Sequence, residues 1–148
     1  MLNAYSEFEP TEMEEGGLAP KGDSTASDSN LVYVVDDEPL VAQVVASMLE
    51  YAGLNPVVFD RPQTALKAFL AANPRPALVI TDFVMNPLNG MELIARLKEA
   101  EPGLKTILYS GSVGADIFKH HLVKPDRFLS KPMELGPLIA LVRDLVNS

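Results

Sequence analysis

The sequence predicts an α/β domain in which a doubly wound, mostly parallel sheet is covered by helices on both faces. Two observations support this prediction. Short apolar, β-branched runs alternate with segments in which apolar residues recur at helical spacing, and five such strand–helix units follow residue 30. Three of the predicted strands, at 31–35, 77–81 and 104–109, are almost purely apolar, which is typical of strands buried on both faces.

The first two units have clear boundary signals. Pro39 suits the first turn of the helix after strand 31–35, and Gly53 suits the end of that helix. The second strand, at 56–59, begins with proline, which favours an edge of the sheet. Asp60 is expected to cap the next helix, which has Pro62 near its start.

The remaining units follow the same pattern. The last strand is expected at 127–130, and Pro102-Gly103 ends the helix that precedes strand 104–109. The apolar stripes of the predicted helices, which are expected to face inward, fall within 40–52, 65–70, 93–97, 115–122 and 134–146, and the second of them includes Phe69 and Leu70.

The first thirty residues differ in composition from the rest of the chain. The 148 residues include 20 acidic and 12 basic side chains, for a net charge of −8. Residues 1–30 hold seven acidic residues and one lysine, which gives −6. Such a segment buries too little apolar surface to offset the entropy of ordering it. We therefore expect a disordered acidic tail at 1–29 and one folded domain at 30–148.

Composition also excludes several classes of protein. The chain has no cysteine, which excludes disulfides, thiolate metal sites and a cysteine nucleophile. Its sequence has no apolar run near the roughly 18–20 residues of a membrane span, and its start lacks the features of a signal peptide. The acidic balance argues against non-specific binding of nucleic acid. We expect a cytoplasmic protein without a nucleic-acid or membrane partner.

Polar residues follow four of the predicted strands: Asp36 and Asp37 follow the first, Asp82 the third, Ser110 the fourth and Lys131 the fifth. Ligands of open parallel sheets bind outside the carboxyl ends of the strands. Three neighbouring carboxylates repel one another, and Mg²⁺ resolves that conflict. An aspartate can attack phosphorus, while a lysine and a serine can bind phosphoryl oxygens. Because the sequence contains neither of the common glycine-rich nucleotide-binding motifs, the phosphoryl donor is expected to be a small molecule or another protein.

The motifs around these positions resemble the receiver domain of two-component response regulators, over residues 30–148. They are Val35-Asp-Asp-Glu-Pro39, Thr81-Asp-Phe-Val-Met85 with Gly90, Ser110-Gly111, and Phe128-Leu-Ser-Lys-Pro132. The resemblance implies the flavodoxin-like receiver fold, with five parallel strands in the order 2-1-3-4-5.

The resemblance implies a magnesium-dependent phosphoacceptor site. Asp82 would accept a phosphoryl group from a phosphohistidine on a sensor histidine kinase or a histidine phosphotransfer protein. Asp37 would bind Mg²⁺ directly, and Asp36 mainly through water. The backbone carbonyl of Val84 would be a further ligand, beside Asp82 itself.

The resemblance also implies a switch. Lys131 would pair with the phosphoryl group, and the peptide bond between Lys131 and Pro132 is usually cis in the family. Ser110 would move toward a phosphoryl oxygen, and Phe128 would swing inward behind it. The face formed by the fourth helix, the fifth strand and the last helix would then bind a downstream protein, with a homodimer as another possible partner.

The sequence also indicates how such a protein would act. Because the chain ends at Ser148, directly after the last helix, we expect a single-domain regulator without an output domain. Aspartyl-phosphate chemistry, including autodephosphorylation, is within its reach, but the interpretation is a signalling switch rather than a metabolic enzyme.

The sequence is also compatible with other functions. Asn86 stands where the family usually has proline, and Lys124-Pro125-Asp126 replaces the usual pair of small residues. These departures motivate the alternative of a degenerate receiver that serves as a phosphorylation-independent binding or dimerisation module. A magnesium phosphohydrolase would need a second aspartate two residues after Asp82, where Val84 stands. The acidic pair at 36–37 also suits a plain helix start.

Overall fold

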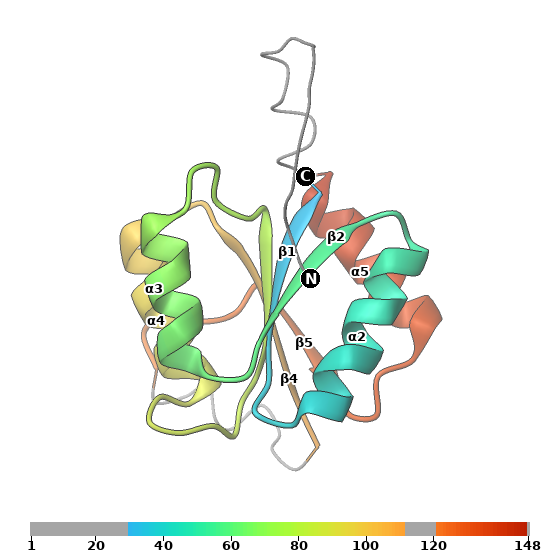
Figure 1. The fold of residues 1–148 in the computed structure, drawn as a ribbon, viewed down its shortest axis with the longest axis horizontal. Helices are drawn as coiled ribbons and strands as arrows, with labels where there is room; N and C mark the ends of the chain where they lie inside the picture. Colours follow the sequence, from blue (N-terminus) through green and yellow to red (C-terminus); the bar gives the residue numbers. More distant parts are fainter. Residues whose placement is uncertain (1–29, 112–120, 148) are drawn as a thin grey trace, which may run out of the picture.

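The computed structural model describes residues 30–111 and 121–147, which form one five-stranded parallel sheet with helices on both faces (Figure 1). The strands lie in the order β2-β1-β3-β4-β5, which confirms the predicted fold class and strand order. The strands are β1 (Leu31–Val35), β2 (Asn55–Phe59), β3 (Leu78–Asp82), β4 (Lys105–Ser110) and β5 (Arg127–Ser130). The helices are α2 (Pro39–Tyr51), α3 (Pro62–Ala71), α4 (Gly90–Ala100) and α5 (Leu135–Val146).

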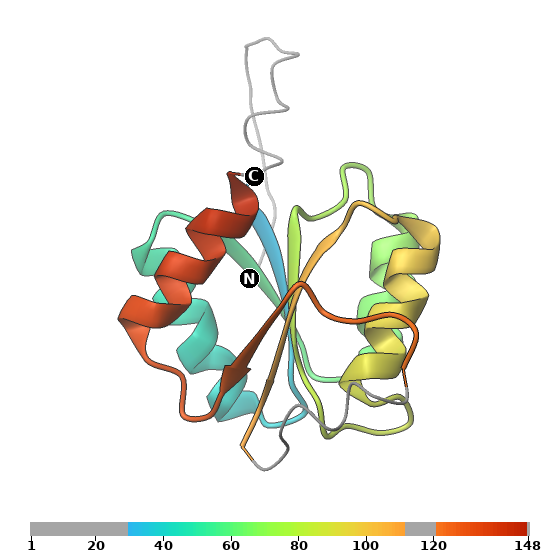
Figure 2. The same cartoon turned by 180° about the vertical axis from the view of Figure 1, so that it is seen from behind.

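Helices α2 and α5 cover one face of the sheet, and α3 and α4 cover the other (Figures 1 and 2). Because successive strand residues point to opposite faces, each strand feeds two cores. Val34 of β1 packs in the core beneath α2 and α5, together with Leu49 and Leu138. Its neighbour Val35 packs in the core beneath α3 and α4, with Phe69. The apolar strands β1, β3 and β4 are therefore central, and β2 is an edge strand, as the sequence predicts.

Two predicted details of α3 are wrong, and Leu40 and Val44 of the stripe predicted in α2 are exposed. Asp60 does not cap α3: the N-cap is Arg61, which makes no side-chain cap hydrogen bond, and Pro62 occupies the first turn. A proline there needs no donor partner and already has helical φ, so the helix starts without a capping side chain. Leu70 does not face inward but is 51% exposed, because Phe69 takes the sheet-facing position one residue earlier.

Strands β3 and β4 extend one residue beyond their predicted ends. In the parallel ladders, Asp82 of β3 is paired with Tyr109 of β4, and Ser110 of β4 is paired with Ser130 of β5. Asp82 and Ser110 are thus the last residues of their strands rather than loop residues. Their backbones are fixed by the sheet, which makes this edge a rigid platform for side chains.

Two predicted segments fall outside the described residues: the tail at 1–29, and residues 115–120 of the helix expected at 115–122. Within the described ranges, no helix is both long enough and apolar enough to cross a bilayer.

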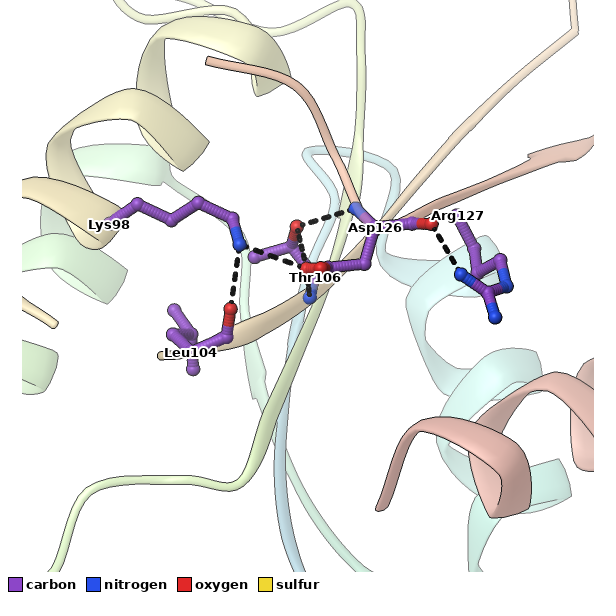
Figure 3. Close-up of polar contacts among 5 residues, drawn as sticks. All are labelled: Lys98, Leu104, Thr106, Asp126 and Arg127. Carbon is purple, nitrogen blue, oxygen red and sulfur yellow. Dashed lines mark hydrogen bonds and ion pairs between the residues drawn. The ribbon is translucent and has the colours of Figure 1, made fainter. Parts of the chain in front are cut away.

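The amino-terminal edge of the sheet is held by a polar network around Asp126, just before β5 (Figure 3). The carboxylate oxygen Oδ2 of Asp126 accepts hydrogen bonds from Lys98 Nζ at 2.9 Å and from the backbone N–H of Thr106 at 2.8 Å. Lys98 also donates to the carbonyl of Leu104 at 2.8 Å. Burial raises the pKa of Asp126, but the Lys98 and Thr106 hydrogen bonds outweigh it and hold that pKa below its usual value. The network joins α4, β4 and β5.

Replacing Asp126 with asparagine is expected to lower the free energy of unfolding by about 1–3 kcal/mol at neutral pH. A carboxyl with a lowered folded-state pKa contributes stability above its unfolded pKa of about 3.9, and this contribution is lost as pH falls through the folded value. Denaturant unfolding at pH 7 and at pH ~3 measures the difference in the free energy of unfolding between wild type and Asp126→Asn. This difference should be smaller in acid.

A matched control is Asp144→Asn, which removes the exposed ion pair with Arg127, where the Asp144 side chain is 63% exposed. Its expected cost is at most about 1 kcal/mol. If Asp126→Asn lowered the free energy of unfolding by the same amount in acid, the ionised Asp126 carboxylate would not be the source of the stabilisation.

Candidate functional site

The residues singled out in the sequence meet at the carboxyl ends of the strands, at the lower end of the sheet in Figure 1. Asp36 follows β1, Asp82 ends β3, Ser110 ends β4 and Lys131 follows β5. A cavity of about 460 Å³ opens there. It is lined by Asp37, Glu38, Asp82, Val84, Ser110, Gly111 and Lys131.

Three carboxylates gather at this cavity: Asp37 and Asp82 line it, and Asp36 is buried beside them. Asp36, Asp37 and Asp82 each offer an oxygen, and these oxygens all lie within 4.8 Å of one another. Asp36 is 0% exposed and Asp82 is 4% exposed, whereas Asp37 is exposed to solvent. The predicted convergence of the three carboxylates is therefore present in the fold.

Lys131 lies opposite the carboxylates. Its Nζ is 3.2 Å from Asp82 Oδ1, 3.6 Å from Asp36 Oδ2 and 3.7 Å from Glu38 Oε1. Burial would lower the pKa of Lys131, but the Asp36 and Asp82 charges outweigh it and raise that pKa, so the ammonium stays charged. The peptide bond between Lys131 and Pro132 is cis, as the family resemblance implies.

The electrostatics of Asp82 are unfavourable to its charge. Burial and the neighbouring Asp36 carboxylate raise the pKa of Asp82, and the nearby Lys131 only partly opposes them. A bound cation would relieve this repulsion. The donor set also fits a hard divalent metal, because carboxylate oxygens are the ligands that Mg²⁺ prefers and Asp37 keeps the site open to water. Asp36, Asp37 and Asp82 would hold the ion, and Val84 lines the same cavity.

Metal and charge at Asp82 are expected to act in opposite directions on stability. An acid with a raised folded-state pKa lowers stability when ionised, and this cost is released as pH falls through that pKa. Asp82→Asn should therefore raise the unfolding midpoint at neutral pH in a chelator. Mg²⁺ at a hundred times its dissociation constant should stabilise wild type by about 2.7 kcal/mol. Thermal unfolding of both proteins with Mg²⁺ and with chelator measures this.

In the variant, most of the metal stabilisation should disappear, because one of the three carboxylates is gone. Asp60→Asn, an exposed aspartate after β2, is the matched control and should respond to Mg²⁺ as wild type does. Equal stabilisation of wild type and Asp82→Asn by Mg²⁺ would place the ion elsewhere.

Ser110 and Phe128, the predicted switch residues, lie in different surroundings. Ser110 is buried at the cavity wall, and its carbonyl accepts the Lys131 N–H at 3.0 Å. Phe128 on β5 is half-buried and packs against the cluster of Met91, Ile94 and Leu108. Ser110 is thus close to Asp82 and Lys131 in the site, whereas Phe128 belongs to the core beneath α4.

Two features of the site were missed by sequence reasoning. Tyr109, next to the end of β4, donates its hydroxyl hydrogen to Asp36 Oδ2 at 2.6 Å. The backbone N–H of Glu38 donates to Asp36 Oδ1 at 2.9 Å. Because the strand is apolar and buried on both faces, the sequence does not show to which face the Tyr109 side chain points. The contact is therefore seen only in the fold.

A sequence profile of the response regulator receiver domain matches residues 32–143. The probable transcriptional regulatory protein TcrX of Mycobacterium tuberculosis is 28% identical over 117 residues, covering 78% of this chain and 49% of that protein. The response regulator Rre1 of Synechocystis is 32% identical over 118 residues, covering 78% of this chain and 51% of Rre1. The chain spans about half the length of these two relatives.

Solved structures are similar over the same region. A response regulator receiver protein from Pseudomonas putida has a TM-score of 0.68 at 32% identity, covering 77% of this chain and 95% of that one. The receiver domain of a sensor histidine kinase from Pseudomonas aeruginosa, described with a magnesium ion coordinated in its active-site cleft, has a TM-score of 0.72 at 16% identity. It covers 80% of this chain and 98% of that one. The chain belongs to the response regulator receiver domain family of two-component signalling.

Proposed function

We propose that Asp82 accepts a phosphoryl group, in a Mg²⁺-dependent reaction, from a phosphohistidine on a sensor histidine kinase or histidine phosphotransfer protein. The observation that carries this proposal is the placement of Asp82 at an open cavity, close to two other carboxylates and 3.2 Å from the Lys131 ammonium. The magnesium ion in the cleft of the P. aeruginosa domain supports the choice of metal.

The chemistry uses the side chains in fixed roles. A carboxylate oxygen of Asp82 attacks phosphorus, the phosphorus–nitrogen bond to the donor breaks, and the imidazole nitrogen keeps the electron pair and takes a proton from water. Mg²⁺ at the carboxylates would supply positive charge against the phosphoryl oxygens. Lys131 neutralises another part of that charge, and the Ser110 hydroxyl donates to a phosphoryl oxygen. Later attack by water on phosphorus releases inorganic phosphate and restores the Asp82 carboxylate.

Phosphorylation would be read by a downstream protein. The face proposed for this is built from β5 and α5 together with the helix expected before β5, which falls mainly on residues outside the described part of the chain. Membership of the family supports a histidine kinase on the input side and an effector on the output side.

The test is intact-mass spectrometry after incubation with Mg²⁺ and a small acyl phosphate. Wild type should gain the mass of one phosphoryl group, and chelation of Mg²⁺ should prevent the gain. Asp82→Asn should gain none, whereas the control Asp60→Asn should behave as wild type. Full phosphorylation of Asp82→Asn would reject Asp82 as the acceptor.

The same sample distinguishes the phosphoacceptor from the binding-module alternative. A degenerate receiver would show no saturable change of its tyrosine or amide NMR signals with millimolar Mg²⁺ and no gain of mass. The close approach of all three carboxylates favours the phosphoacceptor function over that alternative.

A further inference from the structure

Tyr109 joins the acidic and the basic sides of the site. Its side chain is 0% exposed, and its hydroxyl donates to Asp36 Oδ2 at 2.6 Å. A short hydrogen bond to an ionised carboxylate is about twice as strong as one between neutral groups. The resemblance to the receiver family assigns no role to this residue, which lies one position before Ser110.

The Asp36 carboxylate is held at both oxygens. Oδ1 accepts the Glu38 N–H at 2.9 Å, from the start of α2, and Oδ2 accepts the Tyr109 hydroxyl, from the end of β4. Donors on two separate elements leave the carboxylate no freedom to rotate. Each oxygen still has a lone pair, so Asp36, whose carboxylate lies within 4.8 Å of those of Asp37 and Asp82, can offer an oxygen to an ion in one fixed orientation.

The ring of Tyr109 contacts Lys131 on the basic side of the site. The Nζ of Lys131 lies 4.9 Å from the ring centroid, within the range of a cation–π contact. The same nitrogen is 3.6 Å from Asp36 Oδ2. Tyr109 therefore contacts both groups: its hydroxyl donates to the Asp36 oxygen that faces Lys131, and its ring lies beside the Lys131 ammonium.

We infer that Tyr109 is a positioning residue of the Mg²⁺ site: its hydroxyl orients Asp36 toward the ion, and its ring supports the Lys131 ammonium. This inference rests on the proposed function, because it assumes that the carboxylates bind Mg²⁺. Hydrogen-bond partners of metal-binding side chains typically change metal affinity by about 10–100-fold when removed. Tyr109→Phe, which removes only the hydroxyl, should therefore weaken Mg²⁺ binding by about tenfold or more.

The experiment is titration of Mg²⁺ followed by calorimetry on wild type, Tyr109→Phe and Tyr33→Phe. Tyr33 is the matched control: it is also buried, but it packs against Phe59 and Phe69 on the other face of the sheet. Loss of affinity confined to Tyr109→Phe supports the inference, and an equal loss in both variants would assign it to a general effect of deleting a buried hydroxyl. Unchanged affinity in Tyr109→Phe overturns the inference but leaves the proposed function standing. Absence of Mg²⁺ binding in wild type overturns both.

A second measurement, made on wild type, tests the inference even if Tyr109→Phe does not fold. In wild type, the Tyr109 ring carbon that bears the hydroxyl should shift in NMR spectra when Mg²⁺ is added, whereas the same carbon of Tyr33 should not. A Tyr109 signal that does not respond at saturating Mg²⁺ would contradict the inference.

Discussion

Lys131→Met is expected to slow phosphorylation of Asp82 by about 10²–10³-fold, the usual cost of removing one group that stabilises developing charge. The Lys131 ammonium is 3.2 Å from Asp82 Oδ1 and is held beside the site by Tyr109 and Asp36. Methionine keeps much of the side-chain volume but has no charge, so the phosphoryl oxygens lose the ammonium that lies 3.2 Å from Asp82. A time course of intact mass with a small acyl phosphate at saturating Mg²⁺ gives the rate.

The control for this variant is Lys67→Met on the exposed side of α3. It removes the same charge from the molecule but lies outside the cavity, so its rate should equal that of wild type. If Lys131→Met reacted as fast as Lys67→Met, Lys131 would have no part in phosphoryl transfer.

Gly90→Ala is expected to lower the free energy of unfolding by about 1–3 kcal/mol or more, as overpacking of a close contact does. Gly90 begins α4, and a Cβ there would overlap the backbone carbonyl oxygen of Asp82 and lie 2.6 Å from Leu108 Cδ1. Backbone in a central strand cannot move aside cheaply, so α4 or the end of β3 must shift. Denaturant unfolding measures the loss, and the phosphorylation rate should fall with it because Asp82 is displaced.

Gly136→Ala in α5 is the matched control. A Cβ at Gly136 meets no atom within 4 Å, and alanine has the higher helix propensity, by up to about 1 kcal/mol. This control should be as stable as wild type or more so. Wild-type stability of Gly90→Ala would show that α4 does not pack on Asp82 as described.

The layout of the site could be predicted from the sequence because it depends mainly on the topology of the sheet. Parallel strands bring their carboxyl ends to one edge, so Asp36, Asp82 and Lys131 had to meet once the alternation of strands and helices was recognised. The same alternation predicts the central position of the apolar strands. These inferences need only the period of the apolar pattern and the order of the elements.

Contacts inside the layers could not be predicted in this way. Tyr109 lies in a run buried on both faces, where the pattern does not reveal which side a residue serves, and its bond to Asp36 joins residues 73 positions apart. Gly90 is visible in the sequence as part of a motif, but its close approach to the Asp82 carbonyl depends on how α4 packs. The predicted cap at Asp60 was wrong because α3 starts at Pro62 with Arg61 as its N-cap. The predicted inward position of Leu70 was wrong because Phe69 takes the sheet-facing position.

Locating the phosphoryl group on the chain shows whether Asp82 is the phosphoacceptor. Borohydride reduces an aspartyl phosphate to an alcohol and leaves free carboxylates intact, so reduction followed by peptide mass mapping marks the acceptor. After incubation with Mg²⁺ and a small acyl phosphate, we expect a single alcohol, at position 82, and none when Mg²⁺ is chelated. An alcohol at position 36 or 37, or no alcohol in a protein that had gained phosphoryl mass, would reject Asp82 as the acceptor.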